Sequence, residues 1–293
     1  MSLKSINKLN FKFKEIISEK ADCLGGSHLF DCYKDKNGEV ILIIAYFDIN
    51  NPAQQIHHFL FITLKDNKVI KELKCHKDRV LTVRYFQNPY SKKDYLISAD
   101  RKLDVIVLDL NDFCKIFERN IPYDSFIYSN LLIFDLKDIY AVTSTLGKGR
   151  TKIFNLKEQS KFIEINDTKN LPVYYLAYWY NKKSNKHIII QCGKEKVLMT
   201  EFPNNEVYDT FNTDKEYPYN LSGLVITNGG RDLLVVSATF GLITIYDLEQ
   251  KKIMFKIEIK NVFLYNFVIW NDNNLFVLDT SNKKLLNFNI KYN

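Results

Sequence analysis

The sequence predicts an all-β protein, a single β-propeller of four-stranded antiparallel blades, and two observations lead to this fold class. First, one pattern recurs at Asp109, Asn155, Glu201 and Asp247, each 46 residues after the one before. In most copies a β-rich strand ends in an aromatic residue or leucine, an acidic or amide residue follows, and a polar turn leads to another strand. Second, each period holds four β-branched or aromatic runs, and no long window keeps the 3.6-residue period of a helix.

The segment 68–110 shows the content of one period. It divides into the runs KVIKELK, VLTVRYF, DYLISA and DVIVLDL, which are separated by short polar turns. Four strands in a period of this length are typical of a propeller blade, whereas helical repeats need long amphipathic segments. A weaker copy places Asn289 42 residues after Asp247, and one step of 46 before Asp109 falls on Thr63, within a similar strand–turn–strand segment.

The blades are predicted from groups of three strands, which lie at about 27–64, 80–110, 125–156, 172–202, 221–248 and 262–290. We therefore expect six blades, with seven as the alternative, in one domain that covers residues 1–293. The last group has no strand after it. The run NFKFKEI at about 10–16 resembles a fourth strand, and we expect it to complete the last blade and close the ring.

Composition limits the function classes. The chain has 293 residues, 46% hydrophobic and 26% charged, as in a soluble globular protein. Only 10 Gly and 6 Pro are present, so Asn, Asp, Lys and Ser must form most turns. The net charge of +7 allows an acidic partner without requiring one.

Cysteine spacing and hydropathy bear on the compartment. Cys23, Cys32, Cys75, Cys114 and Cys192 are odd in number and form no CxxC pair, so neither a disulfide framework nor a zinc site is expected. The N-terminal residues lack the apolar core of a signal peptide, and the longest apolar run, 40–47, is too short for a membrane-spanning helix. A cytoplasmic or nuclear location is expected.

One period resembles a known repeat. His76-x-x-x-Val80, YLISAD at 95–100 and VIVLDL at 105–110 resemble a WD40 repeat, with Cys75-His76 and Leu108-Asp109 in place of the family's Gly-His and Trp-Asp. No period has both family pairs, so the resemblance is to a degenerate WD40 propeller. It implies a buried polar network of His76, Ser98 and Asp100. The residues expected to mark the repeat structurally are Ser98, Asp100, Asp109, Asn155, Glu201, Asp247 and Asn289.

No residue pattern indicates catalysis. His57-His58 has no third metal ligand at a recognisable spacing, and the strands expected to line the axis show no recurring Asp, Glu or His. LGKGRT at 146–151 lacks the GxxxxGK(S/T) pattern of a phosphate-binding loop and does not precede a helix, so it is interpreted as a turn. VYYLAYWY at 173–180 is expected to be a buried strand rather than a nucleic-acid stacking platform. We expect a protein that is not an enzyme and has no cofactor, catalytic residue or metal site.

The function that remains is binding. The fold-level expectation is a non-catalytic module, a monomeric propeller within a larger complex, that holds a protein or peptide through its loops. Lysines occur in the turns at both ends of the strands. The alternative is therefore a basic surface for nucleic acid or anionic phospholipid, and a degenerate propeller hydrolase is the least favoured reading. The candidate contact residues are His76, Asp78, Arg79, Arg101, Lys148, Arg150, Lys194, Tyr217 and Tyr219.

Overall fold

The computed structural model places 24 β-strands in two compact units, Lys12–Asn166 and Met1–Phe11 with Asp167–Asn293. The residues it describes are 6–7, 30–47, 57–63, 65–66, 68–121, 127–135, 137–145, 150–158, 162–165, 172–194, 196–212, 220–228, 230–238, 241–258, 264–271, 274–279 and 284–289. The single domain expected over 1–293 stays a prediction.

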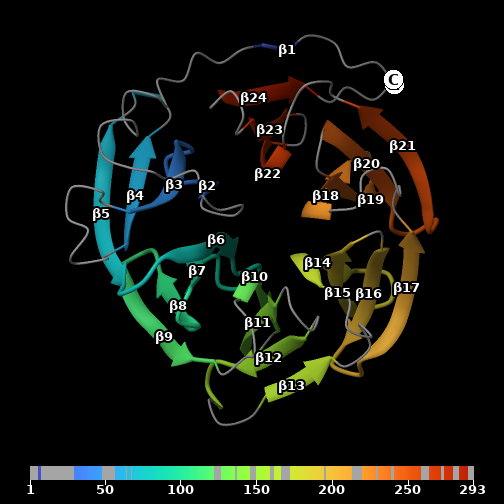
Figure 1. Ribbon diagram of the computed structural model, residues 1–293, viewed down its shortest axis with the longest axis horizontal. Helices are drawn as coiled ribbons and strands as arrows, with labels where there is room; N and C mark the ends of the chain where they lie inside the picture. The colour runs from blue at the N-terminus through green and yellow to red at the C-terminus, as the bar shows by residue number, and fades with distance from the viewer. Residues whose placement is uncertain are drawn as a thin grey trace. The chain divides into compact units, whose positions relative to one another are not determined.

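The unit Lys12–Asn166 contains three four-stranded antiparallel sheets (Figure 1). The first consists of β2 (Phe30–Lys34), β3 (Val40–Phe47), β4 (His57–Thr63) and β5 (Val69–His76). The second consists of β6 (Val80–Gln87), β7 (Asp94–Asp100), β8 (Asp104–Asp109) and β9 (Cys114–Asn120). The third consists of β10 (Ile127–Phe134), β11 (Ile139–Thr145), β12 (Thr151–Asn155) and β13 (Phe162–Ile165).

The other unit also contains three such sheets. The first consists of β14 (Val173–Asn181), β15 (Lys186–Gly193), β16 (Lys196–Phe202) and β17 (Glu206–Asn212). The second consists of β18 (Asn220–Asn228), β19 (Arg231–Ala238), β20 (Leu242–Asp247) and β21 (Lys252–Glu258). The third consists of β22 (Leu264–Asn271), β23 (Asn274–Asp279), β24 (Lys284–Asn289) and, from the start of the chain, β1 (Ile6–Asn7).

The predicted fold class, all-β with four-stranded antiparallel propeller blades, is confirmed. Each of the six predicted groups of three strands coincides with three consecutive strands of one sheet. Five sheets are made of four consecutive strands, and the remaining sheet takes its fourth strand from the N-terminal residues. That strand pairs Ile6 with Phe288 and Asn7 with Asn287. An N-terminal strand thus completes the last sheet, as predicted; its described residues are 6–7, and the segment at about 10–16 where it was expected lies outside the described residues.

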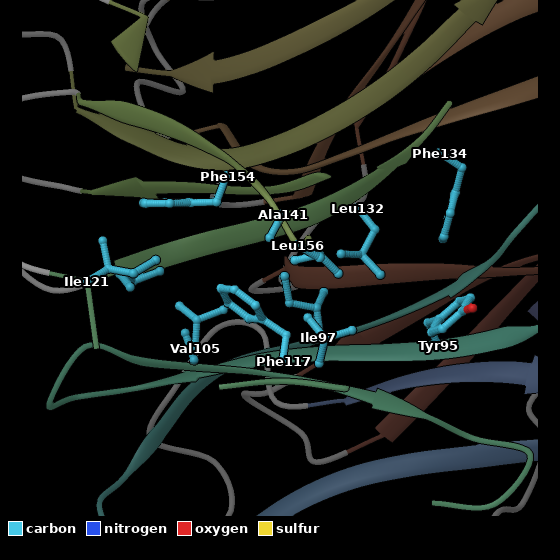
Figure 2. Close-up of a cluster of buried hydrophobic side chains, with 13 residues drawn as sticks. Tyr95, Ile97, Val105, Phe117, Ile121, Leu132, Phe134, Ala141, Phe154 and Leu156 are labelled. Atoms are coloured by element: carbon cyan, nitrogen blue, oxygen red, sulfur yellow. The ribbon is translucent and has the colours of Figure 1, made fainter. Parts of the chain in front are cut away.

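Neighbouring sheets within a unit are held together by apolar side chains. Figure 2 shows the cluster between the sheets β6–β9 and β10–β13, where Ile97 and Phe117 face Leu132 and Phe154. The first strands of successive sheets also contact each other, β2 with β6, β6 with β10, β14 with β18 and β18 with β22. Between β18 and β15 a methyl group on Gly223 would lie 2.8 Å from the sulfur of buried Cys192, so the close packing there favours glycine.

The ladder between the third and fourth strands contains a recurrent β-bulge. In four sheets the fourth strand carries one extra residue opposite the same place, one to two residues before the repeat-marking Thr63, Asp109, Glu201 or Asp247. The extra residues are Ile70, Ile116, Tyr208 and Met254. The bulge is therefore part of the repeat, although the sequence period did not reveal it.

Candidate interaction surface

The polar network that the resemblance implied joins the end of the first sheet to the second sheet. His76 ends β5, and its ring joins Asp100 Oδ2 through Nδ1 at 3.2 Å and Ser98 Oγ through Nε2 at 2.8 Å. The side chains of His76 and Asp100 are 0% and 1% exposed. Asp100 Oδ1 also accepts hydrogen bonds from the backbone N–H groups of Lys102 and Asp104. The network therefore fixes the β7–β8 turn onto the end of β5.

This burial corrects one expectation. His76 was expected among the contact residues, but both of its ring nitrogens form hydrogen bonds with the neighbouring sheet and its side chain is not exposed. A buried imidazole with a hydrogen bond at each ring nitrogen holds its neighbours in place and does not contact a partner protein. Of the predicted contact residues, those beside His76 are the ones left to examine at this end of the sheet.

The residues around His76 form a charged, exposed end of the second sheet. The loop before β6 and the turn after β7 are joined by a hydrogen bond of 2.8 Å from the Arg101 N–H to the Arg79 carbonyl. Arg79 and Arg101 are exposed, and Lys102, 64% exposed, lies 3.6 Å from Asp78. The Asp78 carboxylate also accepts a hydrogen bond from the Arg79 N–H. Three predicted contact residues, Asp78, Arg79 and Arg101, are thus brought together; we call them with Lys102 the Arg79–Arg101 surface.

The remaining predicted contact residues are placed elsewhere. Arg150 directly precedes β12, is half-buried, and lies 3.8 Å from Glu164. Lys194 follows β15 in the other unit and is exposed. Lys148, Tyr217 and Tyr219 lie outside the described residues. The structure therefore supports one compact group rather than the whole predicted set.

The repeat-marking residues have a definite task, which is to hold the turn between the third and fourth strands. Asp109 Oδ1 accepts bonds from Asn111, and Asn155 Oδ1 from the N–H groups of Lys157 and Glu158. Asp247 Oδ1 accepts from the N–H groups of Glu249 and Gln250 at 3.0 and 2.7 Å.

Two other repeat-marking residues depart from this arrangement or are only partly described. Glu201, with a longer side chain, binds Lys186 at 2.5 Å and accepts a longer bond of 3.4 Å from the Asn204 side-chain amide in its turn. Asn289 pairs with Asn274 across the β23–β24 ladder, and nothing further is described of its side chain.

One polar cluster was missed by the sequence reasoning. Asp31 on β2 accepts a hydrogen bond from the Tyr85 N–H at 2.8 Å and lies 3.8 Å from Arg84 Nε on β6. Burial raises the pKa of Asp31, with Arg84 acting in the opposite direction. Tyr33 stacks on Tyr85 at 4.9 Å, and burial raises the pKa of Tyr33 to about 12. These partners lie about 54 residues apart in sequence, and no short motif joins them; they tie two first strands together.

Two segments weighed for other chemistry are structural parts of the sheets. His58 lies on β4 with Nδ1 2.7 Å from Glu72, and among the described residues no three His, Cys, Asp or Glu side chains gather as metal ligands. VYYLAYWY forms most of β14, in which Trp179 is buried and donates to Asp232 at 2.8 Å. Within the described part of the chain, no helix has the length and apolar character that crossing a bilayer would need.

Comparison with family models and with curated proteins finds no match to this chain. What can be stated of its class is the construction of its sheets, which are propeller blades.

Proposed function

We propose that the chain is a non-catalytic, WD40-like interaction module that binds a protein or peptide through the Arg79–Arg101 surface. In this proposal the six sheets are the blades of one propeller, closed by the pairing of β1 with β24, and the protein is a subunit of a larger cytoplasmic or nuclear complex. A propeller offers rigid blade ends that carry independent loops, which suits binding rather than chemistry.

The proposal rests on one observation: two exposed arginines are held in fixed positions by their backbones. Arg79 and Arg101 lie on two different loops, yet their backbones are hydrogen-bonded to each other at 2.8 Å. Beneath them, the buried His76–Ser98–Asp100 network fixes the turn that carries Arg101. Arginine is enriched where interfaces derive most of their binding energy, and a preorganised side chain loses less entropy on binding. An acidic or carboxylate-rich protein segment fits this surface best.

The test is an affinity pull-down of the tagged chain from a lysate of its native cells, with nuclease treatment and washes at low and high salt. The wild-type chain is compared with the double variant Arg79→Glu, Arg101→Glu. The control, Lys92→Glu with Lys182→Glu, makes the same change of charge at exposed positions in turns that follow the first strands β6 and β14.

We expect one protein to be recovered in stoichiometric amount with the wild-type chain and the control, to survive high salt, and to be lost with the double arginine variant. Retention by the arginine variant would remove this surface from the proposal. Recovery of nucleic acid or lipid alone, released by salt, would favour a basic binding surface instead, because contacts with phosphate groups weaken steeply as salt rises.

A further inference from the structure

A different surface is indicated by the free edges of the sheets. In the described part of the chain, the fourth strand of each sheet pairs along one edge with the third strand, and no described strand pairs with its other edge. Such edges invite pairing with another strand, and proteins discourage it with bulges and charged side chains. The four bulged strands β5, β9, β17 and β21 have this protection at equivalent positions.

Strand β13 lacks the bulge. Its described register with β12 runs without interruption from Thr151 opposite Ile165 to Phe154 opposite Phe162. At the equivalent place, before Asn155, the ladder is regular where the four other ladders shift by one residue. The β13 edge is therefore straight, which is the geometry that a further strand requires.

The side chains of β13 also favour an added strand. Phe162 and Ile163 are 48% and 36% exposed, and neighbouring residues of a strand point to opposite faces, so apolar surface flanks the edge on both sides. Two described charged side chains near this edge make contacts within the sheet. Glu164 lies 3.8 Å from Arg150, and the Lys152 ammonium lies 4.8 Å from the centre of the Phe162 ring.

We infer that the β13 edge binds an extended, apolar peptide segment of a partner protein, which adds to the sheet as a fifth strand. The backbone of the segment would pair with the free edge, and β-branched or aromatic side chains would lie opposite Phe162 and Ile163. The described edge is four residues long, roughly 13 Å. This is too short to bury the roughly 1,600 Å² typical of a stable interface between two proteins, so a second copy held by this edge alone is disfavoured. The inference does not depend on the Arg79–Arg101 surface.

The test uses the full chain and a fluorescein-labelled heptapeptide of alternating valine and threonine with a central tyrosine, followed by fluorescence anisotropy. The edge variant is Ile163→Lys. The matched control is Ile70→Lys on β5, where Val69 and Ile70 are also adjacent and exposed, at 43% and 47%, but the strand is bulged. A second peptide, N-methylated at alternate amides, has the same side chains but cannot form the strand ladder.

We expect saturable binding to the wild-type chain and to Ile70→Lys, binding at least about tenfold weaker to Ile163→Lys, and no binding of the methylated peptide. Amide hydrogen exchange of the wild-type chain, which needs no variant, should show peptide-dependent protection at 162–165. The inference is overturned if the wild-type chain does not bind, if both lysine variants bind equally, if the methylated peptide binds as well, or if the protection lies elsewhere. It is also overturned if the wild-type chain dimerises and Ile163→Lys does not, because the occupant would then be a second copy.

Discussion

At the scale of single residues, turn chemistry explains why an acidic or amide residue recurs at each step of 46 residues. An Asp or Asn at the end of the third strand accepts hydrogen bonds from N–H groups two or three residues later, as Asp247 does for Glu249 and Gln250. With only 10 Gly and 6 Pro in the chain, such side-chain bonds replace the usual turn residues. Asp109 holds its turn in the same way, by accepting a hydrogen bond from the Asn111 N–H group.

The first prediction concerns Asp247, which is 1% exposed. Asp247→Ala removes the acceptor for two N–H groups and should lower the free energy of unfolding by about 1–2 kcal/mol. Asp247→Asn keeps the Oδ1 acceptor and should lose less than half of that. Urea denaturation followed by tryptophan fluorescence measures both, and equal losses in the two variants would show that hydrogen bonding to Oδ1 is not what Asp247 contributes.

The sequence was a good guide to strands and a partial guide to the candidate site. Strand groups followed from local spacing, and the His76–Ser98–Asp100 network followed from the resemblance of one period to a known repeat. The Asp31–Arg84 pair did not, since it depends on a contact made between two sheets. The sequence predicted that Arg79 and Arg101 lie in loops at one end of the strands. It could not show that a backbone hydrogen bond joins these loops.

At the scale of strands, the recurrent bulge was invisible in the sequence. The extra residues Ile70, Ile116, Tyr208 and Met254 are all hydrophobic, a type too common in strands to mark a bulge. What sets them apart is position, beside the turn of an edge strand. A bulge there needs one extra residue and no particular side chain, so alternation patterns do not reveal it. We attribute its repetition to the need to keep each edge from pairing.

The second prediction tests that attribution on β9. Deleting Ile116 leaves Lys115 opposite Leu108 and Phe117 opposite Val107, so the ladder becomes regular and the buried Phe117 keeps its place. The deletion variant should fold but self-associate, as measured by sedimentation velocity, because its edge is now straight. Ile116→Ala keeps the extra residue and should stay as monodisperse as the wild-type chain. Similar behaviour of the two variants would argue against a protective role for the bulge.

At the scale of the whole molecule, the chain ends share a unit. Residues Met1–Phe11 belong to the unit formed by Asp167–Asn293, and not to the one formed by Lys12–Asn166 that follows them in sequence. The link is the pairing of β1 with β24 (Figure 1), which covers the edge of the last sheet. A short strand therefore joins the two most distant parts of the sequence.

The third prediction follows from this pairing. Removing residues 1–11 deletes β1, uncovers the backbone edge of β24 and should lower the midpoint of thermal unfolding by several degrees while promoting aggregation. Removing residues 1–4 leaves Ile6 and Asn7 in place and should change neither property. Differential scanning calorimetry with light scattering measures both effects. An unchanged midpoint after the longer deletion would show that β1 contributes little.

Because β1 and β24 lie next to each other, the chain could be connected in a different order without moving the strands. A short linker from the residues after Asn289 to those before Ile6 would connect strands that are already adjacent. New ends could then open in an exposed hairpin turn such as 89–92, between β6 and β7. The protein is thus suited to circular permutation, which would let a fused label or second domain leave the molecule from a chosen sheet instead of from the last one.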